Sequence, residues 1–433
     1  MGFSQALSGL NAASSSLDVL GNNIANSQTV GYKGSSVQFA DVFAGSTGLG
    51  TKVANVLQDF GDGNIENTGR NLDLAISGEG FYRFQQEGEV VYSRNGQLSM
   101  TADGFLENAQ GARIMGYGLS DANDPFSQVV TGGQPVPLNV PSADMPALAT
   151  GTSTGDNPGV QAVYNLDASI DETDASKLNT AQVFTDATQG TSAEVSYHYS
   201  NSYTVYDSLG TAHNVTAYFT KTGANTWDVT TAINGVAGSV DAAGAVQAQG
   251  TLTFNADGTL ADDTPINLAY ANANDGSAQI ATGADNLNFD FDLAGTTQFS
   301  NDSTNTSLTQ DGYTSGALVG ITIEDDGTVM RNYTNEQSMA AGQIVLANFR
   351  NPEGLEAVGD NAWKATGVSG QELVGEAGTG MLGSINSGAI ETSNVDLAKQ
   401  LVDMIVTQRA YQANSQTIST QDEVLQAAIN LSR

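Results

Sequence analysis

The residues that could carry out chemistry in this chain are few and lie far apart. Residues 151–155 read Gly-Thr-Ser-Thr-Gly and match the Gly-x-Ser-x-Gly pattern of a nucleophile, but they lie in a segment rich in Gly, Thr and Pro. A nucleophile elbow needs a strand before it and a helix after it, and neither pattern is present there. The chain has only two histidines, His198 and His213, and both fall in strand-like runs. We therefore expect that the chain is not an enzyme.

Sites for cofactors and metals are not predicted either. The chain has no Cys, which excludes disulfides, thiolate metal sites and a thiol nucleophile. Residues 378–383 match Gly-x-Gly-x-x-Gly, but turn-forming sequence follows them instead of the helix that a dinucleotide site requires. Acidic turns, such as residues 324–327 and the pair Asp262 and Asp263, lack the twelve-residue spacing of an EF-hand. We expect hairpin turns and solvated carboxylates at these places, with no metal and no cofactor.

The composition excludes several classes of partner. The formal net charge is −33, whereas a protein that binds nucleic acid needs a basic surface to neutralise phosphates. There is no apolar stretch of about 18 residues, so nothing is expected to span a membrane. No apolar run headed by Lys or Arg opens the chain, so we expect no cleaved signal peptide. The length of 433 residues leaves room for about three domains.

The charge is spread unevenly along the chain. Residues 151–312 contain 19 acidic side chains and two lysines, a net charge of −17, whereas residues 392–433 carry −1 and residues 1–33 are neutral. Surfaces that pack against copies of themselves cannot carry large like charge, but solvated outer surfaces can. This split is typical of neutral ends that pack and an acidic middle that is exposed. It is equally compatible with acids that simply keep the protein soluble.

The stretch 393–431 is the longest helical pattern in the chain, because it contains no Gly and no Pro. Ser393 and Asp396 have the spacing of a capping box, with the acid at the favourable end of the helix dipole. Apolar residues then recur every seven positions, at Leu397, Met404, Tyr411, Ile418 and Leu425. The companion heptad position is apolar only at Leu401 and Ile429. A stripe this narrow predicts a coiled-coil seam rather than the broad face of a core helix.

The other end of the chain offers a matching partner. Residues 1–24 have apolar side chains seven apart, at Phe3, Leu10, Leu17 and Ile24, with Leu7 and Leu20 beside them. Two terminal helices with matching seams suggest that the chain leaves and returns to one base, and that everything between them is an insertion. The alternative is two unrelated helices that pack on separate domains.

Between the two ends the pattern is almost entirely β. Strand-like runs separated by Asn, Asp and Gly turns fill residues 70–118, about 160–299 and 312–385. The first and last of these blocks have the same pattern of short strand-like runs and turns, which suggests one domain built from two pieces. We predict a multidomain α+β chain: paired terminal coiled-coil helices, a discontinuous mainly-β inner domain and an inserted all-β outer domain. The predicted boundaries are 1–30 plus 392–433 for the helical domain, 31–69 plus 385–391 for a connector, 70–147 plus 306–384 for the inner domain and 148–305 for the outer domain.

Several of these stretches resemble bacterial flagellar axial proteins of the rod and hook. Residues 8–33, SGLNAASSSLDVLGNNIANSQTVGYK, resemble the amino-terminal signature of that family, and residues 393–431 resemble its carboxy-terminal signature. The segments NTGRNLDLAISGEGFYRF and YSRNGQLSMTADGFLENAQG are similar to further shared blocks. The hook members are the most similar, on the segments QFADVFAG, NYTNEQ and GQIVLANF and on the place of the large β insertion.

This resemblance implies a structural subunit that polymerises with copies of itself into the short, curved and flexible tube that joins the rod to the filament. In that family the two terminal helices pair and line a central channel, and the β domains project outward. The implied partners are the distal rod protein, the hook cap protein, the hook–filament junction proteins and the flagellar type III export gate. The resemblance also implies export without signal cleavage and a location in the hook, outside the cell.

Phe39 and Phe43 fit the Phe-x-x-x-hydrophobic motif through which early-exported members of this family meet the export gate. Two Phe side chains that pack the connector against the helices explain the same residues equally well. For the whole chain, the rival readings are a distal rod protein and a secreted β-rich adhesin or binding protein. The adhesin reading leaves the paired heptad ends without an explanation.

Both seams are thin, which affects how the ends behave in a lone subunit. Ordering the backbone costs about 1–2 kcal/mol per residue, and a narrow apolar stripe offsets little of this. We therefore expect residues 1–33 and 392–433 to be largely disordered in the monomer and to fold on assembly.

Overall fold

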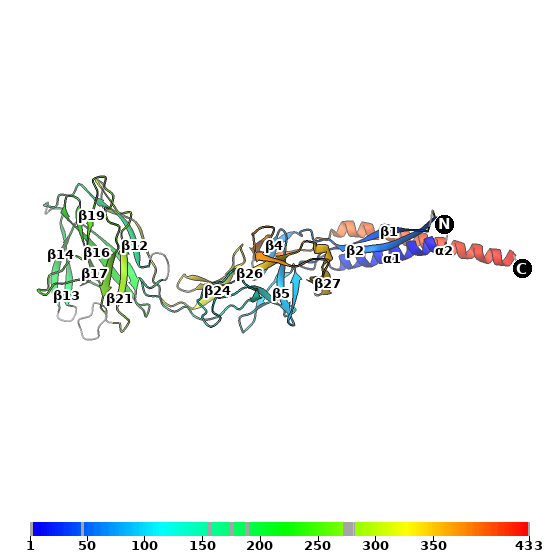
Figure 1. The fold of residues 1–433 in the computed structure, drawn as a ribbon, viewed down its shortest axis with the longest axis horizontal. Coiled ribbons are helices and arrows are strands. Elements are labelled where there is room, and N and C mark those ends of the chain that lie inside the picture. The colour runs from blue at the N-terminus through cyan, green and yellow to red at the C-terminus, as the bar shows by residue number, and fades with distance from the viewer. Residues whose placement is uncertain are drawn as a thin grey trace. The chain divides into compact units, whose positions relative to one another are not determined.

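Two compact units make up the computed structural model, which describes residues 3–44, 47–153, 158–173, 176–186, 190–271, 280 and 282–431. A helix lies near each end of the chain and strands fill the rest (Figure 1). This confirms the expectation of a mainly-β chain with terminal helices, while the finer four-domain boundaries stay a prediction. Unit 1 comprises Met1–Ala143, Val319–Asn332 and Ser338–Arg433, and unit 2 comprises Asp144–Leu318 and Tyr333–Gln337.

The two helices are α1 (Phe3–Ala25) and α2 (Leu397–Leu431), and neither contains Pro. α2 begins later than the predicted stretch, because Asp396 rather than Ser393 caps it. The Asp396 carboxylate accepts hydrogen bonds from the backbone N–H groups of Ala398, at 2.9 Å, and Lys399, at 3.1 Å. The first turn of a helix leaves such N–H groups unpaired, so a negatively charged acceptor stabilises the start of α2.

A long hairpin follows α1 where the sequence predicted a connector. Its strands, β1 (Ser35–Ala44) and β2 (Thr47–Gln58), form an antiparallel sheet of their own with two irregularities in β1. A two-stranded hairpin is only marginally stable in water. In this chain hydrogen bonds to α1 support the hairpin: the Gln5 amide donates to the Gly48 carbonyl at 2.7 Å, and the Thr51 N–H donates to Ser8 Oγ at 3.2 Å.

The β part of unit 1 has one main sheet built from both pieces of the chain. The backbone path through it runs β24, β25, β26, β10, β5, β6, β28 and β27, with β8, β9, β11 and β29 paired beside it. β26 comes from the second piece and pairs with β10 and β5 from the first, so the two pieces share one sheet. Two smaller sheets, β3 with β31 and β30–β4–β7, complete the unit. Large apolar side chains such as Tyr82, Phe84 and Leu346 are fully buried in its core.

The remaining elements of unit 1 have the following bounds. They are β3 (Ile65–Asn67), β4 (Asp73–Ser77), β5 (Phe81–Gln86), β6 (Glu89–Ser93), β7 (Gly96–Gln97), β8 (Ser99–Met100), β9 (Leu106–Glu107), β10 (Arg113–Tyr117), β11 (Val136–Pro137), β24 (Leu318–Ile323), β25 (Thr328–Tyr333), β26 (Ser338–Asn348), the short 3₁₀ helix η1 (Pro352–Gly354), β27 (Glu356–Gly359), β28 (Ala362–Lys364), β29 (Leu373–Glu376), β30 (Ser384–Ser387) and β31 (Ala389–Glu391).

Unit 2 contains two β-sheets whose inner faces share one hydrophobic core. β12 lies at the middle of the first sheet, and β16 and β17 lie within the second. Tyr164 from β12 and Phe219 and Trp227 from the second sheet are fully buried in this core. The strands are β12 (Val160–Asp167), β13 (Asn179–Asp186), β14 (Thr191–Tyr197), β15 (Tyr199–Tyr206), β16 (Ala212–Gly223), β17 (Thr226–Ile233), β18 (Val236–Ala237), β19 (Gly250–Thr253), β20 (Ile266–Tyr270), β21 (Leu287–Asp292), β22 (Thr297–Phe299) and β23 (Thr304–Gln310).

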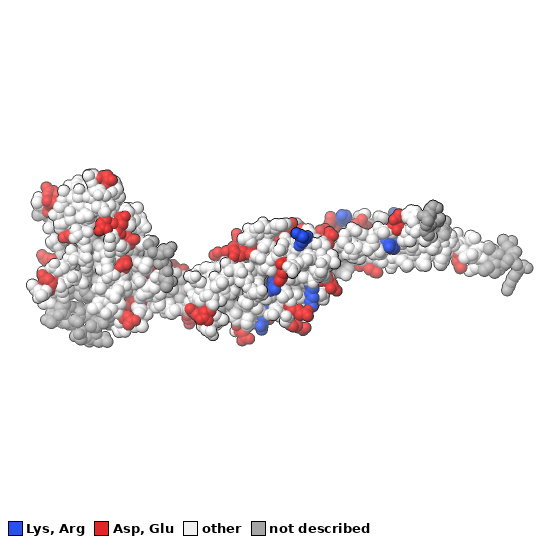
Figure 2. Space-filling view, in the orientation of Figure 1, with Lys and Arg blue, Asp and Glu red and all other residues white. Residues whose placement is uncertain are grey.

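Basic side chains are scarce on the surface of unit 2. In the view of Figure 2 the Lys and Arg atoms lie over unit 1, whereas Asp and Glu lie over both units. Of the two lysines between residues 151 and 312, Lys221 is buried, and its Nζ donates to the carbonyls of Ala168, at 2.7 Å, and Ile170, at 2.8 Å. Lys221 therefore adds no positive charge to the surface. Among the residues of unit 2 that the structure describes, Lys177 is the exposed lysine or arginine.

The separate cores predict that a core substitution in unit 2 leaves unit 1 stable. Phe219→Ala removes a fully buried ring, and we expect it to lower the free energy of unfolding of unit 2 by about 3–5 kcal/mol. The chain has two tryptophans, Trp227 in unit 2 and Trp363 in unit 1, so fluorescence of the Trp363→Phe and Trp227→Phe variants reports each unit separately during urea unfolding. An equal shift of both transitions would contradict this division.

Candidate functional site

α1 and α2 lie side by side and run antiparallel (Figure 1). The Asn23 side-chain amide donates to Gln400 Oε1 at 3.2 Å. Toward the other end of α1, a Cβ atom placed on Gly9 would lie 2.8 Å from Asn414 Nδ2. In both contacts the two residue numbers add to 423, and the contacts are 14 residues apart on each helix. The pairing therefore keeps one register over two heptads.

The two contacts define a line along which the helices meet, and at both of them the residues are small or polar. The fully buried residues of α1 are Ala6, Ala12, Ala13 and Asn23, and none of them is a large apolar side chain. Small side chains let two helix backbones approach closely, but they bury little apolar area and so contribute little stability. These contacts therefore specify the register of the helix pair and add little apolar burial to it.

The apolar seam residues predicted from the sequence lie beside this line. Leu10 and Ile24 directly follow Gly9 and Asn23 in the chain, and Leu397 and Tyr411 precede Gln400 and Asn414 by one helical turn. Six of the predicted residues are 37–58% exposed: Phe3, Leu7, Leu397, Leu401, Tyr411 and Leu425. Five more are half-buried: Leu10, Leu17, Ile24, Met404 and Ile418. The side chain of Ile429 lies outside the described residues.

α2 carries a second set of exposed apolar residues, which the search for one heptad line missed. Val402, Ile405, Val406 and Val424 are 51–64% exposed. Among residues 397–427, whose side chains the structure describes, none is fully buried. A helix that is apolar on several faces is normally buried on several faces. A hollow of about 710 Å³ beside Val424, Leu425 and Phe3 shows the same lack of covering partners at the start of α1.

At the other end of the helix pair, three chain segments meet in a joint, which we define as residues 31–35, 59–64 and 391–394. The Gly31 N–H donates to the Glu391 carbonyl at 2.7 Å, and the Thr392 N–H donates to the Asn64 carbonyl at 2.8 Å. The Gly34 N–H donates to Asn394 Oδ1 at 2.8 Å. The joint therefore ties together segments that lie more than 300 residues apart in the chain.

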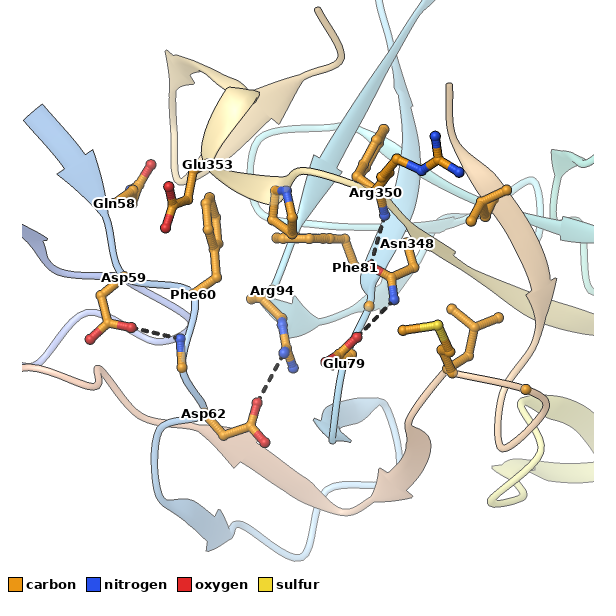
Figure 3. A pocket seen from close by; sticks show the side chains of 18 of the residues that line it. Gln58, Asp59, Phe60, Asp62, Glu79, Phe81, Arg94, Asn348, Arg350 and Glu353 are labelled. Atoms are coloured by element: carbon orange, nitrogen blue, oxygen red, sulfur yellow. Dashed lines mark hydrogen bonds and ion pairs between the residues drawn. The ribbon is translucent and has the colours of Figure 1, made fainter. Parts of the chain in front are cut away.

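Four charged side chains interact at the joint: Lys33, Asp62 and Glu391 belong to it, and Arg94 lies beside it. The fully buried Glu391 carboxylate accepts from Lys33 Nζ at 2.7 Å and from the Gly63 N–H at 2.8 Å, and it lies 3.4 Å from Arg94. Arg94 also pairs with Asp62 at 3.0 Å, a pair visible in Figure 3. Burial lowers the pKa of Lys33, and the nearby positive charge of Arg94 lowers it further, while Glu391 opposes both effects. The two positive and two negative charges balance.

Asn23 extends the joint into the helix pair. Its side chain is buried, accepts from the Ser35 N–H at 2.9 Å and donates to the Ser35 carbonyl at 2.8 Å. Its amide is also the one that reaches Gln400 on α2. One side chain thus connects α1, the start of β1 and α2.

An open groove of about 1240 Å³ lies next to the joint (Figure 3). Its walls come from residues 57–62, 79–81, 348–353 and 373–382. The Asn348 amide donates to Glu79 at 3.1 Å across it. The rim carries the exposed apolar side chains of Leu373 and Met381.

Phe39 and Phe43 both lie on β1, with exposed fractions of 47% and 62%. They are thus accessible in the folded hairpin. Whether they serve export is a separate matter from their place in the fold, and the motif stays a prediction.

The residues with catalytic potential are not brought together. Both ring nitrogens of His213 have close partners, Asp207 Oδ2 at 3.0 Å and Asn234 Nδ2 at 2.9 Å, so this histidine is a buried structural group. His198 Nδ1 accepts from the Lys221 N–H. Residues 378–383 lie between β29 and β30 and lead to no helix, and residues 154 and 155 of the Gly-x-Ser-x-Gly match lie outside the described residues.

Among the residues that the structure describes, no group of three or more His, Asp or Glu side chains could hold a metal ion. In the same residues no helix combines the length and apolarity needed to cross a membrane.

Family models match the chain at four places, at both ends and in the middle. Residues 4–33 match "Flagella basal body rod protein" and residues 386–431 match "Flagellar basal body rod FlgEFG protein C-terminal". Residues 75–155 match "Flagellar hook protein FlgE/F/G D1 domain". Residues 165–313 match "Flagellar basal body protein FlaE D2 domain". The terminal matches cover the two helices together with residues 31–33 and 391–394 of the joint.

Full-length relatives give the same result. The chain is 44% identical to the flagellar hook protein FlgE of Escherichia coli (strain K12) over 100% of both chains. It is 31% identical to that of Borreliella burgdorferi, with 98% of both chains covered. The crystal structure of Helicobacter pylori flagellar hook protein FlgE2 matches 76% of this chain and 100% of its own, with a TM-score of 0.52 and 14% identity, and so supports the fold alone.

The joint predicts a large and local cost when its carboxylate is neutralised. Glu391→Gln leaves Lys33 and Arg94 buried with too little negative charge, and we expect the free energy of unfolding of unit 1 to fall by about 3–5 kcal/mol. Trp363 fluorescence in the Trp227→Phe background measures this. The matched control is Glu66→Gln, an exposed glutamate on the neighbouring β3, which should change stability by less than about 0.5 kcal/mol. Equal effects of the two variants would show that the buried charges are not coupled.

Proposed function

Because this chain belongs to the flagellar hook protein family and is a structural subunit of the bacterial flagellar hook, we propose that its copies assemble through the paired terminal helices. It is a motility component and not an enzyme. The observation that carries the proposal is α2, a 35-residue helix with apolar side chains exposed on several faces and none buried among residues 397–427. Such a helix is incomplete within one chain, and further copies of the chain supply what it lacks.

The energetics favour this assembly. Fully burying a Val, Leu, Ile or Met side chain is worth about 1.5–3 kcal/mol, and on α2 about half of that area is still uncovered. The seam residues and the second apolar set lie on different faces, so we propose that at least two neighbouring copies contact each α2. The near-neutral charge of both ends permits this packing.

We further propose that the chain has the four domains drawn from the sequence. The terminal helices form a coiled-coil domain at the centre of a curved tube, and the connector, inner β domain and outer β domain follow outward. The large net charge of residues 151–312 supports placing the outer domain in contact with solvent. A flexible tube of this kind acts as the universal joint between the rod and the filament.

For export and for the ends of the tube, the proposal extends to specific partners. They are the flagellar type III export gate, the distal rod protein, the hook cap protein and the hook–filament junction proteins. The hook lies outside the cell, and we propose that the chain reaches it unfolded and without signal cleavage. The accessible Phe39 and Phe43 are the residues offered to the export gate.

Charged substitutions in the seam should block assembly and leave the β units folded. Met404→Asp and Leu425→Asp each place a carboxylate on an apolar line, and burying it against a neighbour costs several kcal/mol. Electron microscopy of protein treated with a precipitating salt should show curved hollow tubes for the natural chain and none for either variant. The control is Val368→Asp, an exposed apolar residue of unit 1 away from the helices, which should still form tubes. Tubes from both seam variants would contradict the proposal.

The unassembled subunit should have disordered ends. Hydrogen exchange on monomer, read by mass spectrometry, should be fast along residues 1–24 and 397–431 and slow in the buried strands of both units. In tubes the same terminal segments should become protected. Slow exchange along both ends of the monomer would show that the helices do not depend on assembly.

The export motif should respond to changes that leave the folded core alone. Phe39→Ala and Phe43→Ala together should reduce the amount of chain secreted by cells that carry the flagellar export apparatus by about tenfold or more, a loss of about 1.4 kcal/mol in gate affinity. Val37→Ala with Val53→Ala in the same hairpin is the control. Equal secretion of both variants would leave the two Phe with a packing role only.

A further inference from the structure

The charged side chains of the joint lie near the end of α1 and the start of α2. We call the two chain segments that join these helix ends to the joint the roots of the helices. Lys33 follows the end of α1 at Ala25 by eight residues, and Glu391 precedes the start of α2 at Leu397 by six. We propose that the Lys33–Glu391 pair, supported by Arg94 and Asp62, is a positioning site for assembly: it holds the two roots together before the helices form. This rests on the proposed function, because it concerns how the ends become ordered during assembly.

Three of the four charged residues, Glu391, Arg94 and Asp62, are held in place by residues outside both helices. Glu391 lies on β31, where it pairs with Ile65 of β3, and Arg94 directly follows β6. Arg94 also donates to the Gly78 carbonyl at 2.8 Å, within the β part of unit 1. None of the bonds that hold Glu391, Arg94 and Asp62 uses a residue of α1 or α2. Lys33 is therefore the one member that comes from the amino-terminal side.

Without α1 the hairpin gives little support to the first root, whose other bonds run from the Gly31 N–H to the Glu391 carbonyl and from Asn361 Nδ2 to the Val30 carbonyl, both at 2.7 Å. β1 and β2 form a two-stranded sheet that leans on α1 through Gln5 and Ser8. When α1 is disordered this support is missing, and an isolated hairpin is marginal. The Lys33 ammonium, by contrast, is held in the joint by Glu391 and by the Gly61 carbonyl, both at 2.7 Å.

Holding Lys33 shortens the loop that must close when the helices first touch. The described helix contact nearest the joint is that between Asn23 and Gln400. When residues 30–34 leave the joint together with Lys33, the nearest fixed points are Gly63 and Glu391, so 40 and 9 residues, 49 in all, separate them from this contact. With Lys33 on Glu391 the separations are 10 and 9 residues, 19 in all. Loop closure scales as the 3/2 power of length, so closure becomes about fourfold more favourable.

The joint also gives pairing a direction. Gly31 and Gly34 bond to Glu391 and Asn394, so the two chains leave the joint next to each other. Contact begins at Asn23 with Gln400 and continues outward through Gly9 with Asn414 in the same register. The hollow beside Phe3 and Leu425 is then the last part of the pair to be covered.

The test compares Lys33→Met with Lys52→Met, an exposed lysine on β2, in the full-length chain. Lys33→Met leaves Glu391 with Arg94 and the Gly63 N–H, so the β part of unit 1 keeps its partners. Elongation from preformed tube seeds, followed by light scattering, should be about fourfold slower for Lys33→Met and unchanged for Lys52→Met. The urea unfolding midpoint reported by Trp227 should stay in place for both variants, whereas that reported by Trp363 should fall for Lys33→Met, because the buried Glu391 loses one of its two positive partners.

Two outcomes would overturn the inference. If Lys33→Met elongates at the rate of Lys52→Met, the pair does not position the ends. If Lys33→Met elongates slowly only under conditions in which Trp363 shows unit 1 to be partly unfolded, the pair is a stabilising contact and nothing more.

Hydrogen exchange on the natural monomer gives an independent reading. The amides of Gly31, Gly34 and Gly63 should be protected while those of α1 and α2 exchange freely. Residues 31–33 and 392–394 should thus be ordered in the monomer, in contrast to the disorder that the sequence predicts for residues 1–33 and 392–433. Free exchange at all three would show that the joint forms only with the helices, and so overturn the inference. This measurement needs no tubes, so a natural chain that fails to polymerise would count against the proposed function and still leave the positioning role to be decided here.

Discussion

The carboxylate of Glu391 is fully buried, and unit 1 depends on how that charge is satisfied. An isolated buried carboxylate would cost several kcal/mol, so it must have positive partners and hydrogen bonds. Lys33, Arg94 and the Gly63 N–H supply them from three separate stretches of chain. One of these stretches leads to α1, and the strand that carries Glu391 leads to α2. The ion pairs and the hydrogen bond of this one buried carboxylate therefore bring the segments next to both terminal helices of a 433-residue chain together.

The two units differ in how complete they are. Unit 2 has two sheets that cover each other, a core with fully buried aromatic rings from both sheets, and a lysine bound by carbonyls in its interior. α2 has apolar residues on several faces and no buried side chain in the part described. A subunit of a polymer needs both kinds of structure. One part must fold within a single chain, and the other must keep apolar surface that neighbouring copies cover. The small and polar line between α1 and α2 suits this division, since it sets the register without using the large apolar residues.

The terminal helices and the β middle could be predicted from the sequence, because each rests on a short repeat of residue types, whereas the role of the heptad residues as an assembly seam stays a prediction. The start of α2 was predicted too early, since both Ser393 and Asp396 are good caps and only the backbone decides between them. The joint could not be predicted, because Lys33 and Glu391 are 358 residues apart and the signature that contains Lys33 does not indicate its partner. The second apolar set on α2 escaped for a different reason: a helix that is apolar on many faces has no dominant period. The small line between the helices was likewise hidden, since Gly9 and Asn23 carry no apolar signal at all.

The scarcity of exposed basic residues on unit 2 has a consequence for the polymer as a material. Each copy adds a charge of −33, and the lysine inside unit 2 offsets nothing at the surface. A tube of such subunits is a polyelectrolyte that must gather a cloud of mobile cations as it grows, whereas nucleic acid loses part of its cloud when a basic protein binds. Assembly should thus take up cations and become more favourable as the screening length shrinks. The solvent's ions are in this sense a component of the tube, and their concentration sets how closely its acidic surfaces can approach one another.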